Sequence, residues 1–243
     1  MSKGNAWIPG GSSGIGLATA RELAVAGYTV LLSGRTEASL KDAVASLRGM
    51  GANADYAVCD VSDPVAVASA HKALAQEHGP ISILVNSAGF NIPERSWSSI
   101  NSEAFDSAVA GNLGGTLSTI VAVLPEMREA ENGLIVNLVS GAGRYVFPGA
   151  GPAYTASKHG VFAMTGTLNM EEAKNGIRAC ALCPGEVDTP IMDKRPQSPS
   201  DDVRSRMLSA EDVAQFIRYL AEAPPTVNFT EVVMMPTGRS RAS

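Results

Sequence analysis

The chain has 243 residues, of which 45% are hydrophobic and 18% charged, and its formal net charge is −5. These values are typical of a folded globular protein and exclude a disordered chain. The acidic balance disfavours nucleic acid as a partner, because nucleic-acid-binding surfaces are basic. No run reaches the roughly 20 apolar residues of a membrane span, so we expect no membrane partner.

Three cysteines in a chain of this length favour a reducing compartment over a disulfide scaffold. The opening residues "MSKGNAWIPGG" contain no long apolar core of the kind found in secretory signals. We therefore expect a cytoplasmic protein. Cys180 and Cys183 have the spacing of a redox or zinc motif, but no second pair or histidine cluster follows. This favours two buried strand residues.

Short β-rich runs alternate with helical spacing along the chain. The runs are "NAWIP", "TVLLS", "ADYAV", "ISILVNSAG", "LIVNLVS", "IRACALCPG" and "TEVVMMP". Helical patterns begin at Ile15 and then cover 37–49, 63–78, 102–130, 152–175 and 209–222. This alternation predicts an α/β fold with a parallel sheet covered on both faces. No linker divides the chain, so we expect one domain over 1–243, with a substrate lid at about 189–208.

The first predicted strand runs into a glycine-rich turn, "PGGSSGIG" at 9–16, which opens the first helix. Glycine lets the backbone approach a ligand closely, and the free N–H groups of a helix start attract a pyrophosphate. Gly10, Gly14 and Gly16 depart from the commonest dinucleotide spacing. The turn predicts nucleotide binding, although a tight strand-to-helix connection alone has a similar pattern.

The second predicted strand ends in "LLSGRTE", at the distance from the glycines where an acid would bind a ribose 2′-hydroxyl. Here Gly34 and Arg35 stand instead. A guanidinium suits a 2′-phosphate, so the sequence predicts NADP(H) in preference to NAD(H). A solvated surface arginine is the alternative.

"YTASK" at 154–158 places Tyr154 and Lys158 on one helix face. A nearby ammonium favours the phenolate, and we expect it to lower the tyrosine pKa from its usual value of about 10. The pair is therefore a candidate general acid–base, or two unrelated groups on a solvated helix. Pro152 suits the first turn of this helix. His159 is expected to pack or to face solvent.

Together these motifs resemble the single-domain short-chain dehydrogenase/reductase family. The resemblance covers nearly the whole chain and rests on ordered motifs: the glycine turn, "CDVSD" at 59–63, "NSAG" at 86–89, Asn112, Ser140, "YTASK", and "PGEVDT" at 184–189. It implies a Rossmann-type, doubly wound sheet of seven parallel strands. It also implies an oxidoreductase for a secondary alcohol or its ketone, and a homo-oligomer (tetramer or dimer) formed through the helices that hold Asn112 and Tyr154.

The resemblance also implies a cofactor site. Asp60 would accept from the adenine amino group, Val61 would lie beside that ring, and Asn86 would steady the central strands. Asp60 as a simple turn cap is the alternative. No metal is expected. The implied cofactor residues are Gly10, Ser12, Ser13, Gly14, Ile15, Gly16, Gly34, Arg35, Asp60, Val61, Asn86, Ala88, Gly89, Tyr154, Lys158, Pro184, Gly185, Val187 and Thr189.

Four residues match the catalytic tetrad of that family: Asn112, Ser140, Tyr154 and Lys158. Tyr154 would exchange a proton with the substrate oxygen, which Ser140 would hydrogen-bond. Lys158 would also hold the nicotinamide ribose, and Asn112 would hold a water that links Lys158 to solvent. The alternatives are a strand-end hydroxyl bonded to its own backbone for Ser140 and a local helix kink for Asn112.

Some positions depart from the family pattern, and the substrate stays open. Pro9 replaces a threonine before the glycine turn and removes a backbone donor. A 3-oxoacyl-thioester reductase, a hydroxy-amino-acid dehydrogenase and a non-catalytic NADP(H) sensor remain as alternatives. The lid carries four cations that could meet an anionic substrate, although a solvated loop face is favoured: Lys194, Arg195, Arg204 and Arg206.

Overall fold

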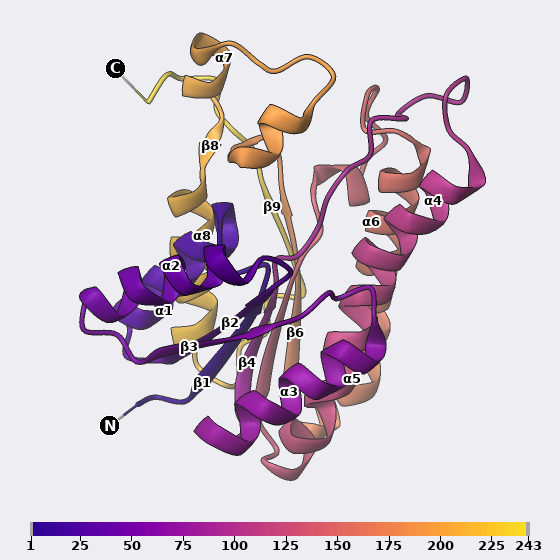
Figure 1. Cartoon of the computed structure of the whole chain (residues 1–243). Helices are drawn as coiled ribbons and strands as arrows, with labels where there is room; N and C mark the ends of the chain where they lie inside the picture. The colour runs from indigo at the N-terminus through magenta and orange to yellow at the C-terminus, as the bar shows by residue number, and fades with distance from the viewer. Residues whose placement is uncertain (1, 242–243) are drawn as a thin grey trace.

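The computed structural model describes residues 2–241, and a seven-stranded sheet runs through its centre (Figure 1). The strand order is β3-β2-β1-β4-β5-β6-β9, and all neighbouring pairs are parallel. The strands are β1 (Asn5–Pro9), β2 (Thr29–Gly34), β3 (Ala54–Val58), β4 (Ile81–Asn86), β5 (Gly133–Leu138), β6 (Ile177–Pro184) and β9 (Glu231–Met234). The predicted seven-stranded, doubly wound sheet is confirmed.

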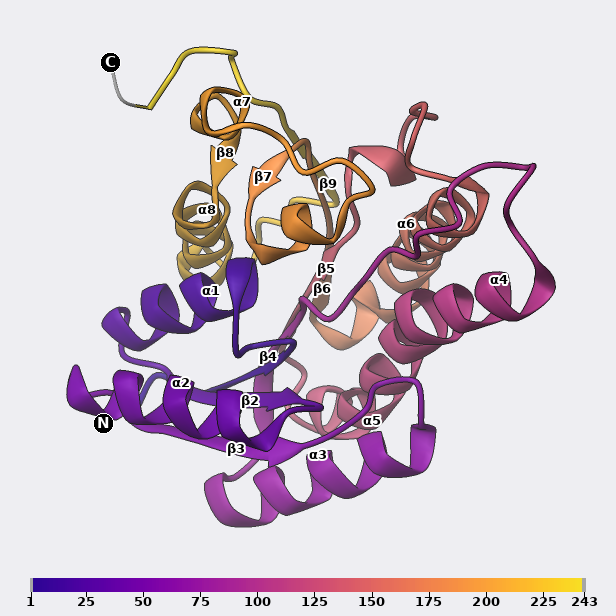
Figure 2. The same ribbon diagram turned by 45° about the horizontal axis from the view of Figure 1, so that its top comes forward.

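Helices cover both faces of this sheet, as Figures 1 and 2 show. Helices α1, α2 and α8 lie on one face, and α3, α5 and α6 lie on the other. The helices are α1 (Gly14–Val25), α2 (Glu37–Gly49), α3 (Pro64–His78), α4 (Ser102–Val109), α5 (Gly115–Glu129), α6 (Pro152–Glu172), α7 (Asp201–Ser205) and α8 (Ala210–Glu222).

The strands feed two separate cores because successive side chains of a strand point to opposite faces. Ile8 and Leu32 pack in the core under α1, α2 and α8. Their neighbours Trp7 and Leu31 pack in the core under α3, α5 and α6. Burial on both sides explains why these strands read as nearly continuous apolar runs.

The predicted helix at 102–130 is interrupted. A π-helical turn, Ala110–Gly114, joins α4 to α5. The whole stretch Ser102–Glu129 is long and apolar enough to cross a membrane by length and composition, contrary to the expectation that no such run exists. In the fold, 44% of its most apolar window is buried, and α5 packs on β4 and β5. Its hydropathy is thus that of a helix that covers a sheet.

The segment predicted as a lid is joined at its base by a two-stranded sheet that the sequence did not predict. β7 (Val187–Asp188) pairs in parallel with β8 (Leu208–Ser209). Between them lie a 3-10 turn, Pro190–Lys194, and α7. In Figure 2 this segment lies beyond the end of the sheet on the α8 side, across from α4 and α6.

Candidate active site

A cleft of about 1360 Å³ lies at the carboxyl ends of the parallel strands, spanning the β1–β4 switch point where the strand order reverses. It collects residues from every segment the sequence singled out. Those that line it are Gly10, Ser12, Ser13, Gly14, Ile15, Gly34, Arg35, Asp60, Val61, Ala88, Gly89, Ser140, Tyr154, Lys158, Pro184, Gly185, Val187 and Thr189. Three predicted residues lie behind this lining: Gly16, Asn86 and Asn112.

The glycine turn can only be built from glycine. Gly10 has φ +80°, and a Cβ there would lie 2.6 Å from the backbone nitrogen of Ala88. Gly14 has φ +51°, and a Cβ on Gly16 would lie 2.3 Å from the carbonyl oxygen of Gly10. Gly10 and Gly14 thus adopt backbone angles that favour glycine, whereas Gly16 lets α1 pack close to the turn.

Pro9 does not disturb this turn. The residue ends β1, and its carbonyl accepts from the backbone N–H of Ser87 at 3.1 Å. The next residue, Gly10, donates to the carbonyl of Ser33 at 2.7 Å. The donor that proline lacks is therefore not needed to hold the loop against β2 and β4.

The start of α1 fits a pyrophosphate. Ser13 is its N-cap residue, but the Ser13 side chain accepts no capping hydrogen bond. The first N–H groups of the helix therefore keep their capacity to bind an anion, and the helix dipole favours one there. Ser12 and Ser13 lie beside them in the cleft wall. The turn and the helix start thus suit the dinucleotide that the sequence predicts.

Arg35 and Asp60 line the part of the cleft that follows β2 and β3. Arg35 is exposed there and has no ion pair among residues 2–241. Asp60 Oδ1 accepts from the backbone nitrogen and hydroxyl of Ser62 at 2.9 and 2.8 Å. Partial burial acts to raise the pKa of Asp60, but these bonds and the Arg35 charge outweigh it and lower the pKa. Asp60 is thus a turn residue whose Oδ2 has no partner in the described part.

Asn86 belongs to a buried polar chain that joins the two central strands. Its Nδ2 donates to Asn137 Oδ1 at 2.8 Å, and its Oδ1 accepts from Thr119 Oγ1 at 2.6 Å. Asn137 in turn donates to Thr165 Oγ1 at 2.9 Å. The chain links β4 and β5 to α5 and α6, so Asn86 lies behind the cleft and holds its walls together. This agrees with the steadying role expected for Asn86.

The π turn presents Asn112 to the loop after β4. Asn112 is fully buried, and its amide accepts from the nitrogen of Phe90 and donates to the oxygen of Phe90, each at 2.9 Å. A Cβ on Gly89 would lie 3.2 Å from Asn112 Oδ1 and 3.4 Å from Lys158 Nζ. Asn112 thus lies in a π-helical turn, a distortion that is frequent at functional sites. Asn112 positions the segment that faces Lys158.

Ser140 ends β5 in a strained conformation, with φ 140° and ψ 158°. This region is essentially restricted to glycine, and a residue there costs of order 1–3 kcal/mol. The hydroxyl accepts from the nitrogen of Ala142 at 3.1 Å and acts on the phenol of Tyr154, where it opposes the rise in pKa that burial causes. The strand-end alternative is thus compatible with a site role, because Ser140 bonds its own loop backbone and still lines the cleft with Tyr154.

Tyr154 lies in the first turn of α6, after Pro152 at the helix start. Lys158 follows one turn later, with its Nζ 5.7 Å from the centroid of the tyrosine ring. The lysine is 5% exposed and donates to the carbonyl of Leu138 at 2.8 Å. The two residues share one face, as their spacing predicts.

The expected effect of Lys158 on the tyrosine is not what the structure gives. Burial raises the pKa of Tyr154, and the groups that act against this are the Ser140 hydrogen bond and the charges of Arg95 and Arg195. Burial also lowers the pKa of Lys158 to about 8. Lys158 is not among the described charges that shift the Tyr154 pKa. The expectation that this lysine lowers the tyrosine pKa is therefore wrong for the protein without its ligands.

The residues set aside at the outset lie away from the cleft. Cys180 packs in the core under α1, α2 and α8, whereas Cys183 packs on the opposite face beside Val139. Both thiols are free, and burial raises their pKa values to about 12 and about 11. This confirms two buried strand residues. His159 Nδ1 lies 2.9 Å from the carbonyl oxygen of Thr155 and does not line the cleft.

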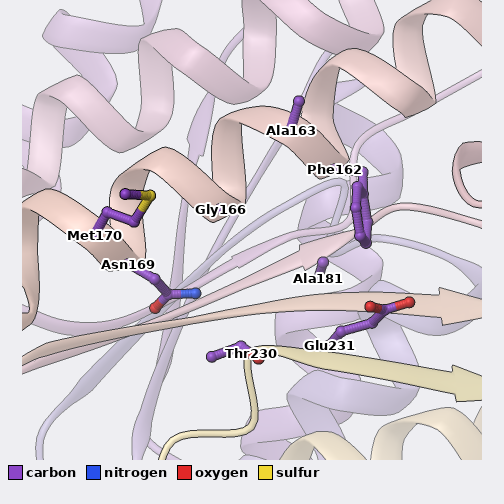
Figure 3. A pocket seen from close by; sticks show the side chains of 8 residues that line it. All are labelled: Phe162, Ala163, Gly166, Asn169, Met170, Ala181, Thr230 and Glu231. Atoms are coloured by element: carbon purple, nitrogen blue, oxygen red, sulfur yellow. The ribbon is translucent and has the colours of Figure 1, made fainter.

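A second, smaller hollow of about 330 Å³ lies between α6 and the edge of the sheet (Figure 3). Phe162 and Met170 project toward it from α6, and Glu231 flanks it from β9. Glu231 is held by Arg144, whose Nε donates to it at 2.6 Å. None of the site residues predicted from the sequence lines this hollow, so the large cleft is the candidate active site.

Comparison with known proteins identifies the family. The protein-family model described as short chain dehydrogenase matches residues 5–200. The chain belongs to the short-chain dehydrogenase family. This short-chain dehydrogenase is similar to the 3-oxoacyl-acyl-carrier-protein reductase of Thermotoga maritima, at 34% identity over 88% of each chain. It is also similar to the D-beta-hydroxybutyrate dehydrogenase of Rhizobium meliloti, at 32% identity over 93% of this chain and 85% of the relative.

A solved structure of an actinorhodin polyketide ketoreductase variant with NADPH has a TM-score of 0.87 to this short-chain dehydrogenase. The two chains are 29% identical, and the match covers 97% of each. Relatives and solved structures thus agree with the family model, and this protein is an oxidoreductase of that family.

Two residues beside the phenol were not found from the sequence motifs. Arg95 lies in the loop between β4 and α4, inside the unremarkable stretch "NIPERSW". Arg195 was counted only among the lid cations. Both line the cleft, and both act electrostatically on Tyr154. No motif carries Arg95, so only the fold could place it there.

Proposed function

We propose that this short-chain dehydrogenase is an NADP(H)-dependent enzyme that interconverts a secondary alcohol and its ketone, with Tyr154 as the general acid–base. The cofactor assignment is supported by the unpaired Arg35 at the end of the cleft where the adenosine 2′-phosphate would lie. A structural relative bound to NADPH supports it as well. When bound, the nicotinamide would supply or accept the hydride.

The residues of the chain would do the rest. Tyr154 would donate its proton to the oxygen of the ketone and take it back in the oxidative direction, help of this kind being worth about 10²–10⁴-fold. Ser140, which lines the cleft with Tyr154, would bond the same oxygen as it gains charge. With a pKa of about 8, Lys158 can exchange a proton near neutral pH, and we propose that it restores the proton of Tyr154.

One observation carries this proposal: Tyr154, Ser140 and a buried lysine whose Nζ is 5.7 Å from the centroid of the tyrosine ring line one nucleotide-sized cleft. The test is an NADPH-depletion screen over ketones, sugars, oxo acids and thioesters. Oxidation of NADPH that depends on one carbonyl class supports the proposal. Tight NADPH binding with no turnover of any class would favour a nucleotide sensor instead.

A 3-oxoacyl-thioester reductase is the second candidate, favoured by the similarity to the Thermotoga maritima enzyme. The same cleft and the same acid would serve it. The two candidates differ only in what must lie beside the ketone, a neutral thioester or another group. Rates with a small thioester and with its free acid separate them.

We propose further that the protein is a homo-oligomer. Leu117 and Val121 on α5 are 49% and 57% exposed, and Met170 on α6 is 86% exposed. Apolar side chains gathered on helices of this kind are typical of protein interfaces. These helices begin beside Asn112 and at Tyr154, so an interface there would stiffen the cleft wall.

A further inference from the structure

Two arginines meet at the substrate end of the cleft. Arg95 comes from the loop after β4 and Arg195 from the lid, and both line the cleft together with Ser140 and Tyr154. Burial raises the pKa of the Tyr154 phenol, and the charges of the two arginines oppose that rise. They lie away from Arg35, which sits at the opposite, cofactor end. This end of the cleft is therefore positive close to the reacting group.

Arg95 is held in place without being neutralised. Its Nε donates to the carbonyl of Ile92 at 2.8 Å. Its backbone packs on Gly151, where a Cβ would lie 2.9 Å from Arg95 Cα. No carboxylate pairs with it within residues 2–241, and the side chain is only partly exposed. Its backbone is therefore fixed against the start of α6. The remaining N–H groups of its guanidinium have no carboxylate to bind within residues 2–241.

The neighbouring arginine adds to the positive field. Arg195 pairs with Glu186 at 2.8 Å. Burial lowers the pKa of the Arg95 guanidinium, and the charge of Arg195 lowers it further. The other two lid arginines are fully engaged within the lid, Arg204 with Asp188 and Asp193 and Arg206 with Asp202. A partly buried cation without a counter-ion is costly, and a bound anion would relieve that cost.

We propose that Arg95, assisted by Arg195, binds the carboxylate of a short oxo acid and so makes free oxo acids, rather than their esters or thioesters, the substrates of this enzyme. The planar guanidinium matches a carboxylate in a two-bond fork. An ester or thioester places a neutral group at the same position and forfeits that bond. This inference rests on the proposed function, since it assumes that Tyr154 reduces a ketone.

The reaction balances with the cofactor already invoked. The ketone carbon of the acid gains a hydride from the reduced nicotinamide, which leaves oxidised, and the ketone oxygen gains the proton of Tyr154. The carboxylate keeps its charge throughout, so Arg95 acts on binding and orientation and takes no part in the proton transfer.

The test compares free oxo acids with their uncharged esters and thioester. NADPH-dependent rates are measured with 2-oxobutanoate, 3-oxobutanoate, the methyl ester of each, and the N-acetylcysteamine thioester of 3-oxobutanoate. The variants are Arg95→Met, Arg95→Lys and, as a matched control outside the cleft, Arg21→Met. We expect Arg95→Met to lower kcat/KM for the preferred acid by about 10- to 100-fold, the effect of losing a hydrogen bond between charged groups. The ester rate should fall by a smaller factor, because the ester loses only the effect of the Arg95 charge on the pKa of Tyr154.

The outcomes separate the inference from the function it rests on. Partial recovery in Arg95→Lys, with no effect in Arg21→Met, supports a charge-dependent site. Equal losses for acid and ester in Arg95→Met would overturn it, because Arg95 would then serve the loop or the phenol. A wild type that prefers esters or thioesters would also overturn it and leave the reductase proposal standing. If none of these substrates turns over, calorimetry of 3-oxobutanoate with the NADPH complex decides, and absence of Arg95-dependent binding ends the inference.

Discussion

Lys158 and Tyr154 lie on one face of α6, with the lysine Nζ 5.7 Å from the centroid of the tyrosine ring. Lys158 is buried and Tyr154 is partly buried, and burial moves their pKa values apart, that of the phenol upward and that of the ammonium from 10.5 down to about 8. Below pH 8 the pair therefore starts as a neutral phenol beside a buried ammonium. An incoming ligand, rather than the lysine alone, would have to make the phenolate accessible.

Replacing Lys158 by Met should reveal the cost of burying its charge. The folded pKa of about 8 lies below the ordinary lysine value of 10.5, so the folded protein binds fewer protons than the unfolded chain between these pH values. The cost is fully present below pH 8 and disappears as pH rises through 10.5. It is on the order of 3 kcal/mol. Thermal melts without ligand should show Lys158→Met more stable than the wild type at pH 7.

That difference in melting temperature should shrink steadily between pH 8 and pH 10.5. The hydrogen bond to Leu138 that the variant loses contributes a pH-independent amount, so the narrowing is the diagnostic feature. Lys72→Met, on the exposed face of α3, is the control and should show no such trend. A difference in melting temperature that stays constant across this range would show that the charge of Lys158 does not destabilise the folded protein.

Ser140 offers a way to separate strain from chemistry. Its φ of 140° is tolerated by glycine and unfavourable for alanine. Both Ser140→Gly and Ser140→Ala remove the hydroxyl, so both should lose activity to the same extent. Ser140→Gly should nevertheless be more stable than Ser140→Ala by about 1 kcal/mol, since relief of strain exceeds the added entropy of the unfolded chain. Chemical unfolding measures this, and an alanine variant of equal or greater stability would contradict the strained geometry.

Arg35 should set the cofactor preference. Removing its guanidinium in Arg35→Ala should weaken NADPH binding by about 10- to 100-fold, because a hydrogen bond between charged groups is lost. NADH binding should stay within twofold, since NADH carries no 2′-phosphate. Fluorescence titration measures both, with Arg21→Ala as the control. Wild-type protein that binds NADH at least as tightly as NADPH would refute the assignment.

A charge placed on α5 should break the proposed assembly. Val121 is 57% exposed on that helix, and Val121→Glu would bury a carboxylate in an apolar interface. Light scattering should then give a smaller mass than for the wild type. Val65→Glu, at a 75% exposed position on α3, should leave the mass unchanged. An unaltered mass for Val121→Glu would place the interface elsewhere.

The strand and helix pattern predicted the fold well because it depends on local periodicity. Apolar runs indicated all seven strands, and the resemblance to the family implied that they form one doubly wound parallel sheet. The π turn at Asn112 was visible only as three nearby glycines and an asparagine inside a helical stretch. The β7–β8 pair escaped because each of its strands has only two residues.

The site divides in the same way. The glycine turn, Arg35 and the tyrosine–lysine pair follow from sequence because each is a short motif on one element. The effect of burial on Tyr154 and the approach of Arg95 and Arg195 depend on segments about 40 to 60 residues apart. Such distances are set by the sheet and by the packing of the lid, which no local pattern encodes.

The measurement that tests the central claim most directly is the kinetics of Tyr154→Phe with the best ketone from the screen. The account predicts NADPH binding within twofold of the wild type and a fall in kcat/KM of about 10²–10⁴-fold, the contribution of a general acid. A variant that binds NADPH normally and reduces the ketone at a rate within threefold of the wild type would contradict it.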